Sequence, residues 1–384
     1  MGTEWLHKIA LKVGEKQKGL FTYPVEQQKA YIAHFPEPRD ELERSYFQYC
    51  CQATRDSKLL NGLFNLGALP LSIFFLLKYS HKHVAKAKEE NDCIFFCDGK
   101  PENIIPDSLH QRYPGIVTIT ASESSLDRED TAFLKTLFKR YPFSWMFWLK
   151  IIIKVSRYSD AIKRYAPNAI ISCDEFSFAS SAMTAYCRSK GIKRINVMHG
   201  EKMYNLRDSF MEYDEYYVWD QHYVDLLSDM GAKKEQFRIE LPASMRIQIC
   251  DAIDLQYDYT YYLGNETTEI SQAIANTLRL LSNKGQRICI RPHPRYSNMA
   301  LVTKFFGSFN IEDCKAVTIE QSLLQTGAAI SLYSTVLNQA ASNSIPIVID
   351  DITNPDRFKK LKELRYICIY KEHKLLSEIL GEAQ

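Results

Sequence analysis

The sequence predicts an α/β protein that contains two doubly wound parallel sheets. Two long stretches, 168–231 and 259–380, alternate short apolar runs rich in β-branched residues with segments of helical pattern. Strands separated by helices at this spacing are typical of βαβ units, whose strands pair in parallel. With 384 residues, the chain is long enough for two domains that each bury a core of their own.

Composition excludes several classes of protein. Apolar residues make up 46% and charged residues 24% of the chain, which is typical of a globular protein and not of a disordered one. The 48 basic residues nearly balance the 46 acidic ones, so bulk charge gives no reason to expect nucleic-acid binding. The ten cysteines include no CxxC pair, and Cys93, Cys173 and Cys289 lie in apolar runs. We therefore expect buried thiols in a reducing compartment, with neither a zinc site nor a disulfide framework.

The amino-terminal segments bear on location. Residues 1–18 lack the apolar core and the small-residue cleavage site of a signal peptide. The longest apolar run, 69–77, is far shorter than the ~20 residues that span a bilayer, and the basic stretch 78–88 follows it. Such a pair could rest on an anionic membrane surface, although a core helix with a solvated end would have the same pattern. We expect a cytoplasmic protein, with peripheral contact to the inner membrane left open.

The chain divides into three expected regions, 1–90, 91–245 and 246–384. The first is mainly helical in pattern, is broken by prolines, and is expected to pack on the second. The second has expected strands at 92–97, 116–119, 168–173, 194–198 and 213–219, and helical segments at 122–166, 177–190 and 221–230, of which the last two are closed by Gly191 and Gly231. The third has expected strands at 259–263, 288–290, 316–319, 328–332, 345–349 and 366–370, and helices at 270–282, 319–325, 336–342, 357–365 and 372–380.

Polar residues follow many of these strands. Neither region with strands contains GxGxxG, so a dinucleotide-dependent dehydrogenase is discounted. In doubly wound folds ligands bind beyond the carboxyl ends of the strands. The candidate site residues are therefore Asp98, Asp174, Glu175, His199, the loop 264–268, His293, Ser334, Thr335, Asp350 and Asp351. None of them has metal-ligand spacing, and the last two are expected to cap the next turn.

The segment Arg291-Pro292-His293-Pro294-Arg295 is the most distinctive stretch of the chain. The two prolines prevent a helix from starting and hold the backbone extended after an apolar strand. One titratable ring and two permanent cations on a rigid loop suit an anionic ligand. The alternative is a stiff surface loop whose arginines are solvated or paired with an acid.

Three segments together resemble the donor half of bacterial glycosyltransferases with the GT-B fold. They are Arg291–Pro294, Ser331–Thr335 and the helical Asn338-Gln339-Ala340-Ala341. The His-Pro dipeptide and the Ser/Thr pair are similar to the HP and S motifs of bacterial sialyltransferases and polysialyltransferases, which use CMP-sialic acid. Those families also carry an acidic pair followed by glycine at a strand end. Asp174-Glu175 corresponds to that pair, with Phe176 in place of the glycine.

A second likeness points to other polymer transferases. His199-Gly200, together with 340–346, resembles features of capsule and teichoic-acid polymer transferases. The two resemblances cover roughly residues 168–350. They imply two Rossmann-like domains facing across a cleft, with 91–245 as the acceptor domain and 246–384 as the nucleotide-sugar donor domain.

The resemblance implies an inverting, metal-independent glycosyltransferase without a cofactor. It would move a sialic-acid-like sugar from a CMP-activated donor to a hydroxyl of a bacterial surface glycan such as a capsule or lipooligosaccharide. Its partners would be the nucleotide sugar and an oligosaccharide or glycolipid acceptor. One alternative keeps the fold but uses a UDP- or GDP-sugar or a CDP-polyol in capsule or teichoic-acid-like polymer synthesis. Another is a non-catalytic glycan-export or nucleotide-sugar-binding partner.

Roles can be assigned to the candidate residues. The residues expected to bind the donor nucleotide are Gly264, Asn265, Arg291, His293, Pro294, Arg295, Ser334 and Thr335. His293 would protonate the departing phosphate or donate a hydrogen bond to it, while Ser334 and the helix that follows would cradle it. Either Glu175 or Asp174 would remove the acceptor proton, and the longer side chain of Glu175 favours it. The other carboxylate would cap the next helix, and His199, Gly200 and Glu201 are expected on the acceptor side.

Overall fold

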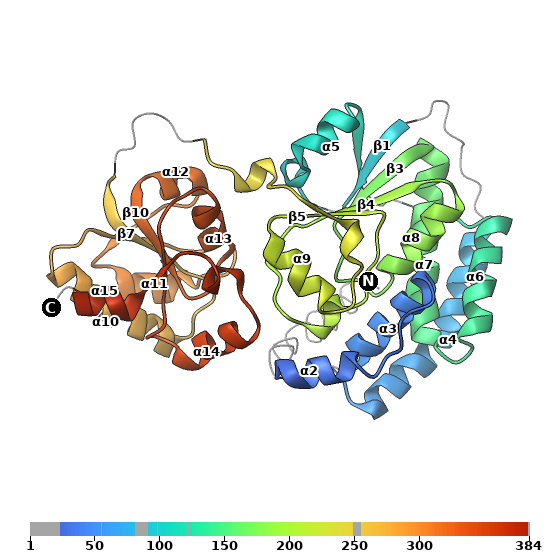
Figure 1. The fold of residues 1–384 in the computed structure, drawn as a ribbon, viewed down its shortest axis with the longest axis horizontal. Coiled ribbons are helices and arrows are strands. Elements are labelled where there is room, and N and C mark those ends of the chain that lie inside the picture. The colour runs from blue at the N-terminus through green and yellow to red at the C-terminus, as the bar shows by residue number, and fades with distance from the viewer. Residues whose placement is uncertain are drawn as a thin grey trace. The chain divides into compact units, whose positions relative to one another are not determined.

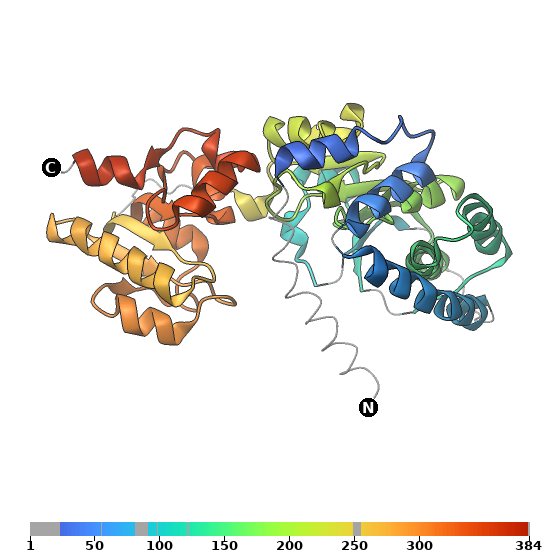
Figure 2. The ribbon, with the colours of Figure 1, turned by 90° about the horizontal axis from the view of Figure 1, so that it is seen from below.

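The computed structural model describes residues 24–54, 56–80, 91–97, 99–120, 123–248 and 255–382, so the expectation for Asp98 lies outside it. These residues form two units (Figures 1 and 2). Unit 1 takes 1–199 and 204–244, and unit 2 takes 200–203 and 245–384.

Unit 1 is built on a parallel sheet of six strands in the order β2-β1-β3-β4-β5-β6. The strands are β1 (Asn91–Phe96), β2 (Ile116–Ile119), β3 (Pro167–Ser172), β4 (Lys193–Val197), β5 (Glu215–Val218) and β6 (Phe237–Ile239). The helices are α2 (Val25–Ile32), α3 (Glu41–Ala53), α4 (Lys58–Ser80), α5 (Asp107–Arg112), α6 (Arg128–Arg140), α7 (Trp145–Tyr165), α8 (Ser180–Ser189) and α9 (Gln221–Ser228). The strand order changes direction between β1 and β3, which creates a switch point there.

Helices cover both faces of this sheet with apolar side chains. Buried residues of α7 and α8 pack on one face, where Ile94 and Ile170 contribute from the strands. The other face buries Phe95, Ile171 and Ile195. Runs of apolar residues without alternation are what a parallel sheet covered on both sides requires. The helical amino-terminal region belongs to this unit, since α3 packs on α8 and α4 packs along α7.

Unit 2 repeats the architecture with the strand order β12-β11-β10-β7-β8-β9, again all parallel. Its strands are β7 (Tyr257–Tyr262), β8 (Ile288–Arg291), β9 (Asn310–Ile311), β10 (Thr326–Ser331), β11 (Ile347–Ile349) and β12 (Lys374–Leu375). Its helices are α10 (Thr268–Asn283), α11 (Met299–Phe306), α12 (Ile319–Leu324), α13 (Thr335–Ser342), α14 (Pro355–Glu363) and α15 (Leu376–Glu382). This is the Rossmann order, with its switch point between β7 and β10. The expected fold class of two Rossmann-like doubly wound units is confirmed.

Several expected elements are wrong in detail. The strand expected at 316–319 is a turn, because Thr318 and Gln321 form a capping box that starts α12. The strand expected at 366–370 is a 3₁₀ helix at Ile367–Ile369, since β12 already pairs with β11 at that edge of the sheet. The single helical region expected at 122–166 is two helices, α6 and α7. Strands β6, β9 and β12 and helices α5 and α11 were not predicted, and the three strands are too short to show a pattern.

Candidate functional site

The loops after β7 and β8 meet at the carboxyl edge of the unit 2 sheet. The hydroxyl of Ser297 donates to the carbonyl of Gly264 over 2.8 Å, and the backbone N–H of His293 donates to the same hydroxyl over 2.7 Å. The Gly264 N–H donates to the Glu266 carboxylate over 2.6 Å, while Asn265 beside it is exposed. One serine thus joins two of the three loops that surround the switch point.

His293 is held in a defined protonation form. Its Nδ1 accepts a hydrogen bond from the backbone N–H of Arg295 over 3.1 Å, and the ring lies 4.4 Å from that of Tyr296. Burial lowers the pKa of His293, and the nearby Arg295 cation lowers it further. A neutral ring whose Nδ1 accepts must carry its proton on Nε2. The ring can therefore donate a hydrogen bond from Nε2, and it is less suited to act as a general acid than the sequence suggested.

The two arginines of this loop differ in environment. Arg291 is 7% exposed, and its guanidinium pairs with the carboxylate of Glu312 and donates to the carbonyl of Val317 over 3.0 Å. Its charge is thus balanced within unit 2, as the alternative of an acid-paired arginine anticipated. Arg295, like Pro294 before it, is exposed. Of the two cations, Arg295 is the one that a ligand could reach.

Ser334 caps α13 at the third loop of this edge. Its hydroxyl accepts from the Val336 N–H over 3.1 Å, and the phenol of Tyr366 donates to its carbonyl over 2.7 Å. The next residue, Thr335, is exposed and begins the helix. A capped helix start presents backbone N–H groups and the positive end of the helix dipole, which suits phosphate. Capping and ligand contact can coexist here.

Arg357 was missed by the sequence analysis. It lies in the first turn of α14, and its guanidinium stacks 5.5 Å from the Tyr333 ring, next to Ser334. Burial lowers the pKa of Arg357. An arginine in a helix that is otherwise rich in charged residues carries no sequence signal, because only the packing distinguishes it from its neighbours.

The acidic pair at the end of β11 has a structural role. Asp350 is fully buried, accepts from the backbone N–H groups of Ile352 and Thr353, and accepts from the phenol of Tyr261 over 2.7 Å. Asp351 accepts from Ser377. Asp350 therefore caps the turn that follows it, as expected. Within the described ranges, no group of three or more His, Cys, Asp or Glu side chains could hold a metal ion.

In unit 1, Asp174 is part of a buried ion pair. Its carboxylate contacts the guanidinium of Arg194 at 2.5 Å and the ammonium of Lys154 at 3.2 Å. Burial would raise the pKa of Asp174, but the two cations outweigh burial and hold that pKa below its ordinary value. Helix α8 begins after Ala179 without a side-chain cap. The expectation that Asp174 or Glu175 caps this helix is therefore wrong.

Glu175 turns into unit 1 and meets His199. The Glu175 side chain is 0% exposed, whereas that of Asp174 is 18% exposed. Glu175 Oε1 lies 3.3 Å from His199 Nδ1, and the Asn196 amide donates to Glu175 Oε2 over 3.3 Å. His199 is 14% exposed, and its ring lies edge-on to that of Phe176. Of this pair, the imidazole is the group that can meet a ligand.

Gly200 and Glu201 belong to unit 2, whereas His199, which directly precedes them, belongs to unit 1. The Glu201 carboxylate accepts a hydrogen bond from the amide of Asn338 on α13 over 2.8 Å. The structure thus places them with the expected donor domain, and not with the acceptor side as anticipated. The reason is that the chain passes from one unit to the other directly after His199.

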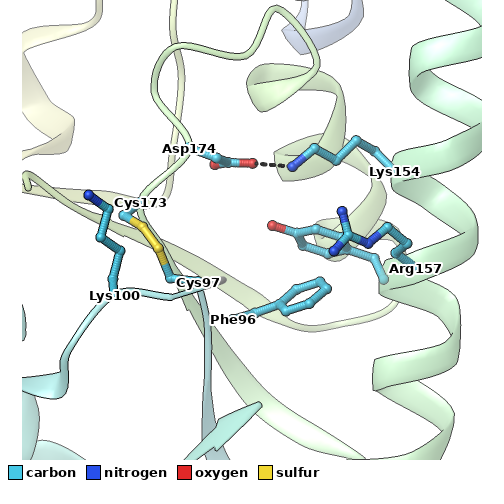
Figure 3. A pocket seen from close by; sticks show the side chains of 8 residues that line it. Phe96, Cys97, Lys100, Lys154, Arg157, Cys173 and Asp174 are labelled. Carbon is cyan, nitrogen blue, oxygen red and sulfur yellow. Dashed lines mark hydrogen bonds and ion pairs between the residues drawn. A yellow bond between two sulfur atoms is a disulfide. The ribbon is translucent and has the colours of Figure 1, made fainter. Parts of the chain in front are cut away.

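A cavity of about 200 Å³ opens at the switch point of unit 1 (Figure 3). Lys154, Arg157 and Tyr158 of α7 form one wall, and residues beyond the ends of β1 and β3 form the rest: Phe96, Cys97, Lys100, Cys173 and Asp174. Three cationic side chains and a single carboxylate line the cavity, and Lys154 is paired with that carboxylate. Lys150 lies one turn before Lys154, and its pKa is lowered by burial and by the nearby cations. This cavity, called the cationic pocket below, suits an anionic group above an aromatic floor.

Cys97 and Cys173 form a disulfide on the wall of the cationic pocket, with their Cα atoms 5.9 Å apart (Figure 3). This pair contradicts the expectation that the cysteines are all free thiols. Phe95 pairs with Ile171 in the register of β1 and β3, so the residues two positions further are also neighbours. Spacing in the sequence could not reveal it, because 76 residues separate the two cysteines.

Comparisons with known proteins found similar solved structures but no similar sequence. No protein-family model matches the chain, and no curated protein matches it. Solved structures that it resembles include UDP-GlcNAc 2-epimerase from Methanocaldococcus jannaschii, at 9% identity and TM-score 0.44 over 76% of this chain and 91% of that one. The Neisseria meningitidis UDP-GlcNAc 2-epimerase is 12% identical, with TM-score 0.43 over 70% and 85% of the two chains. The lipopolysaccharide outer core galactosyltransferase WaaB is 11% identical, with TM-score 0.39 over 76% and 94%.

Proposed function

We propose that this protein is an inverting glycosyltransferase that uses a nucleotide-activated sugar. The observation that carries the proposal is the arrangement at the switch point of unit 2. A neutral His293 ring that can donate from Nε2 and the capped start of α13 follow β8 and β10, which flank β7. Negative charge grows on the departing phosphate during sugar transfer, and fixed donors at that place stabilise it. A non-catalytic nucleotide-sugar-binding partner is the second candidate.

The donor we propose is a CMP-activated, sialic-acid-like sugar. Support comes from the His293-Pro294 and Ser334-Thr335 segments of the sequence. In the structure His293 has its Nδ1 occupied by the Arg295 N–H, and Ser334 caps α13. UDP- or GDP-sugars and CDP-polyols are the competing donors, because a phosphate cradle alone does not select the base. In this proposal the charge on the phosphate is met by Arg295, His293 and the start of α13.

On the acceptor side we infer that His199 takes the proton of the acceptor hydroxyl and that Glu175 is its positioning residue. The carboxylate is fully buried, so it cannot reach an acceptor, but it lies at ion-pair distance from His199 Nδ1. A carboxylate at Nδ1 orients the ring and stabilises the imidazolium that forms. The cationic pocket would then hold an acidic part of the oligosaccharide or glycolipid acceptor, and a peripheral position on the inner membrane would suit the latter.

The donor assignment predicts selective stabilisation by cytidine nucleotides. A ligand that binds only the folded state raises its melting temperature, by more the further its concentration exceeds its Kd. CMP should therefore raise the melting temperature more than UDP, GDP or CDP at equal concentration. All four tryptophans of the chain lie at or before position 219, in the sequence of unit 1. Melting should accordingly be followed by calorimetry, which also reports unit 2. Stabilisation by UDP or GDP without stabilisation by CMP contradicts the donor assignment.

The acceptor assignment predicts a difference between two amide substitutions. His199→Gln should lower the transfer rate by about 10²–10⁴-fold, the range for losing a general base. Glu175→Gln should cost less, about 10-fold to 10²-fold, because the imidazolium that forms loses its charged partner. Both variants should keep the stabilisation by CMP. If Glu175→Gln is the more damaging change, Glu175 itself is the base.

A further inference from the structure

The polarity of helix α4 is inverted with respect to a normal surface helix. Of its 23 residues, Ala68 and Ser72 are buried. Nine of its large apolar side chains are exposed, each to between 38% and 76%: Leu59, Leu60, Leu63, Phe64, Leu66, Leu71, Ile73, Phe74 and Leu77. Phe75, Leu76 and Tyr79, near its carboxyl end, pack on the core of unit 1. Phe143 and Met146, in the segment beside α4, are also exposed. We call this set of exposed side chains the α4 apolar face; the helix that carries it lies at the outside of unit 1 (Figures 1 and 2). Monomeric soluble proteins rarely expose a continuous apolar patch of this kind.

Polar and small residues attach the first part of α4 to the rest of unit 1, and Phe75, Leu76 and Tyr79 attach its last turns. Asn61, Asn65, Ala68 and Ser72 are spaced by four, three and four residues, so they share one face of the helix. Their hydrogen bonds join α4 to unit 1: Asn61 Nδ2 to Ala53 O at 2.7 Å, Asn65 Nδ2 to Phe143 O at 2.7 Å, Met146 N to Asn65 Oδ1 at 3.0 Å, and Ser72 Oγ to Trp145 O at 3.4 Å. The exposed apolar side chains are therefore not a packing accident at one end of the helix.

The charged residues near α4 in the sequence indicate which kind of surface its apolar face would contact. The sequence from 57 to 88 contains no Asp or Glu, whereas it contains five lysines, with Lys58 and Lys78 at the two ends of the helix. Lysines at the ends of an apolar helix can extend to the headgroups of a bilayer while their stems stay among apolar groups. An apolar face with basic flanks complements anionic lipid. An interface for a protein partner more often has a rim of polar residues around its apolar centre.

We propose that the α4 apolar face docks unit 1 on an anionic lipid bilayer, with the helix lying in the interface. Among the described helices, α4 is the one whose length and composition would allow it to cross a membrane. Its hydrogen bonds to unit 1, and the bond from Leu126 N to Tyr79 O of 3.0 Å, hold it along α7 instead. At 1.5 Å per residue it offers a contact about 34 Å long. This proposal does not depend on the sugar-transfer proposal, because it requires neither nucleotide nor acceptor.

Sedimentation with vesicles tests the proposal. The full chain should pellet with vesicles of phosphatidylglycerol and phosphatidylcholine, and less with phosphatidylcholine alone or at high salt. The double variant Leu63→Glu/Phe74→Glu should lower the partition coefficient at least tenfold, since it places two charges where acyl chains would lie. Both side chains are more than half exposed, so the fold should persist. Ile239→Glu/Leu280→Glu is the matched control, because those exposed side chains lie outside the α4 apolar face, and it should pellet like the native chain.

Two kinds of result would overturn the proposal. One is a failure in the vesicle assay: the native chain stays in the supernatant with anionic vesicles, or the Leu63→Glu/Phe74→Glu variant pellets as well as the control. The other is a dimer in light scattering that the Leu63→Glu/Phe74→Glu variant abolishes, without vesicle binding by the native chain, which would assign the α4 apolar face to a second copy. Stabilisation by CMP should be the same in both double variants, so failure here is distinguishable from failure of the donor assignment.

Discussion

Asp174→Asn should lower the free energy of unfolding of unit 1 by about 3–5 kcal/mol, the cost of leaving a buried charge without its partner. Arg194 is 0% exposed, and the other hydrogen bonds of its guanidinium go to neutral groups: the Ser180 carbonyl, the Thr184 hydroxyl and the Ser172 hydroxyl. The rings of Tyr158 and Tyr213 flank the guanidinium. This loss exceeds the roughly 1 kcal/mol expected for a helix cap. Urea unfolding followed by tryptophan fluorescence reports on unit 1, because Trp145, Trp148 and Trp219 lie in it and the sequence of unit 2 contains no tryptophan.

Two further variants show whether the ion pair is the cause. Asp225→Asn makes the same chemical change in an exposed pair of unit 1, 3.9 Å from Lys234, and should cost at most about 0.5 kcal/mol. Adding Arg194→Met to Asp174→Asn should recover part of the lost stability, because the uncompensated cation is removed. A loss below about 1 kcal/mol for Asp174→Asn would mean that Arg194 is balanced by another group.

The same ion pair makes stability depend on pH in a defined direction. The pKa of Asp174 is lower in the folded chain than in the unfolded one, so the unfolded state binds more protons in that range. The stabilisation is therefore complete above the unfolded pKa of about 4 and is lost as the pH falls through the folded pKa. The difference in stability between the native chain and Asp174→Asn should shrink accordingly on acidification.

The sequence was sufficient to predict the fold because each central strand is a short apolar run between turn residues. Strands β3, β4, β7 and β10 lie within two residues of their expected positions. The edges of the sheets were harder, since β9 and β12 have two residues each and depend on their neighbour for pairing. The register between strands that are distant in the sequence cannot be read from local patterns either. The Cys97–Cys173 disulfide shows this most clearly, because it depends on the register between β1 and β3.

For the candidate site, the sequence predicted positions better than orientations. A polar residue at the end of a parallel strand must lie at the carboxyl edge, which covers Asp174, Glu175 and His293. Whether such a side chain faces outward depends on groups that are distant in the sequence. Glu175 has the longer side chain, yet Asn196 and His199 draw it inward. The same holds for helix α4. The sequence shows a stripe of polar and small residues along it, but does not show that this stripe is the side that packs on unit 1.

His293→Ala should lower the rate of sugar transfer by about 10²–10⁴-fold, the range for losing one charge-stabilising donor or one acid. The Nε2–H of the neutral ring is the group lost, and its contribution should be larger in the transition state, where the phosphate gains charge, than in the bound nucleotide. CMP should therefore still stabilise the variant, with a smaller loss in Kd than in kcat. The measurement is kcat from initial rates together with Kd from titration calorimetry.

Two controls separate the donor role of His293 from the shape of its loop. Tyr296→Leu removes the exposed ring that lies against His293 and should change kcat far less, because it leaves the hydrogen bond from the Arg295 N–H to Nδ1 in place. The pH–rate profile gives the second: burial and Arg295 lower the pKa of His293, and protonation of the ring at Nδ1 leaves the Nε2–H in place, so a hydrogen-bond donor role predicts no loss of rate as the pH falls through that pKa. His293→Gln, which keeps an N–H donor, should recover part of the rate. A His293→Ala variant with near-native kcat would mean that the ring only shapes the loop, and the phosphate would then be left to Ser334 and the start of α13.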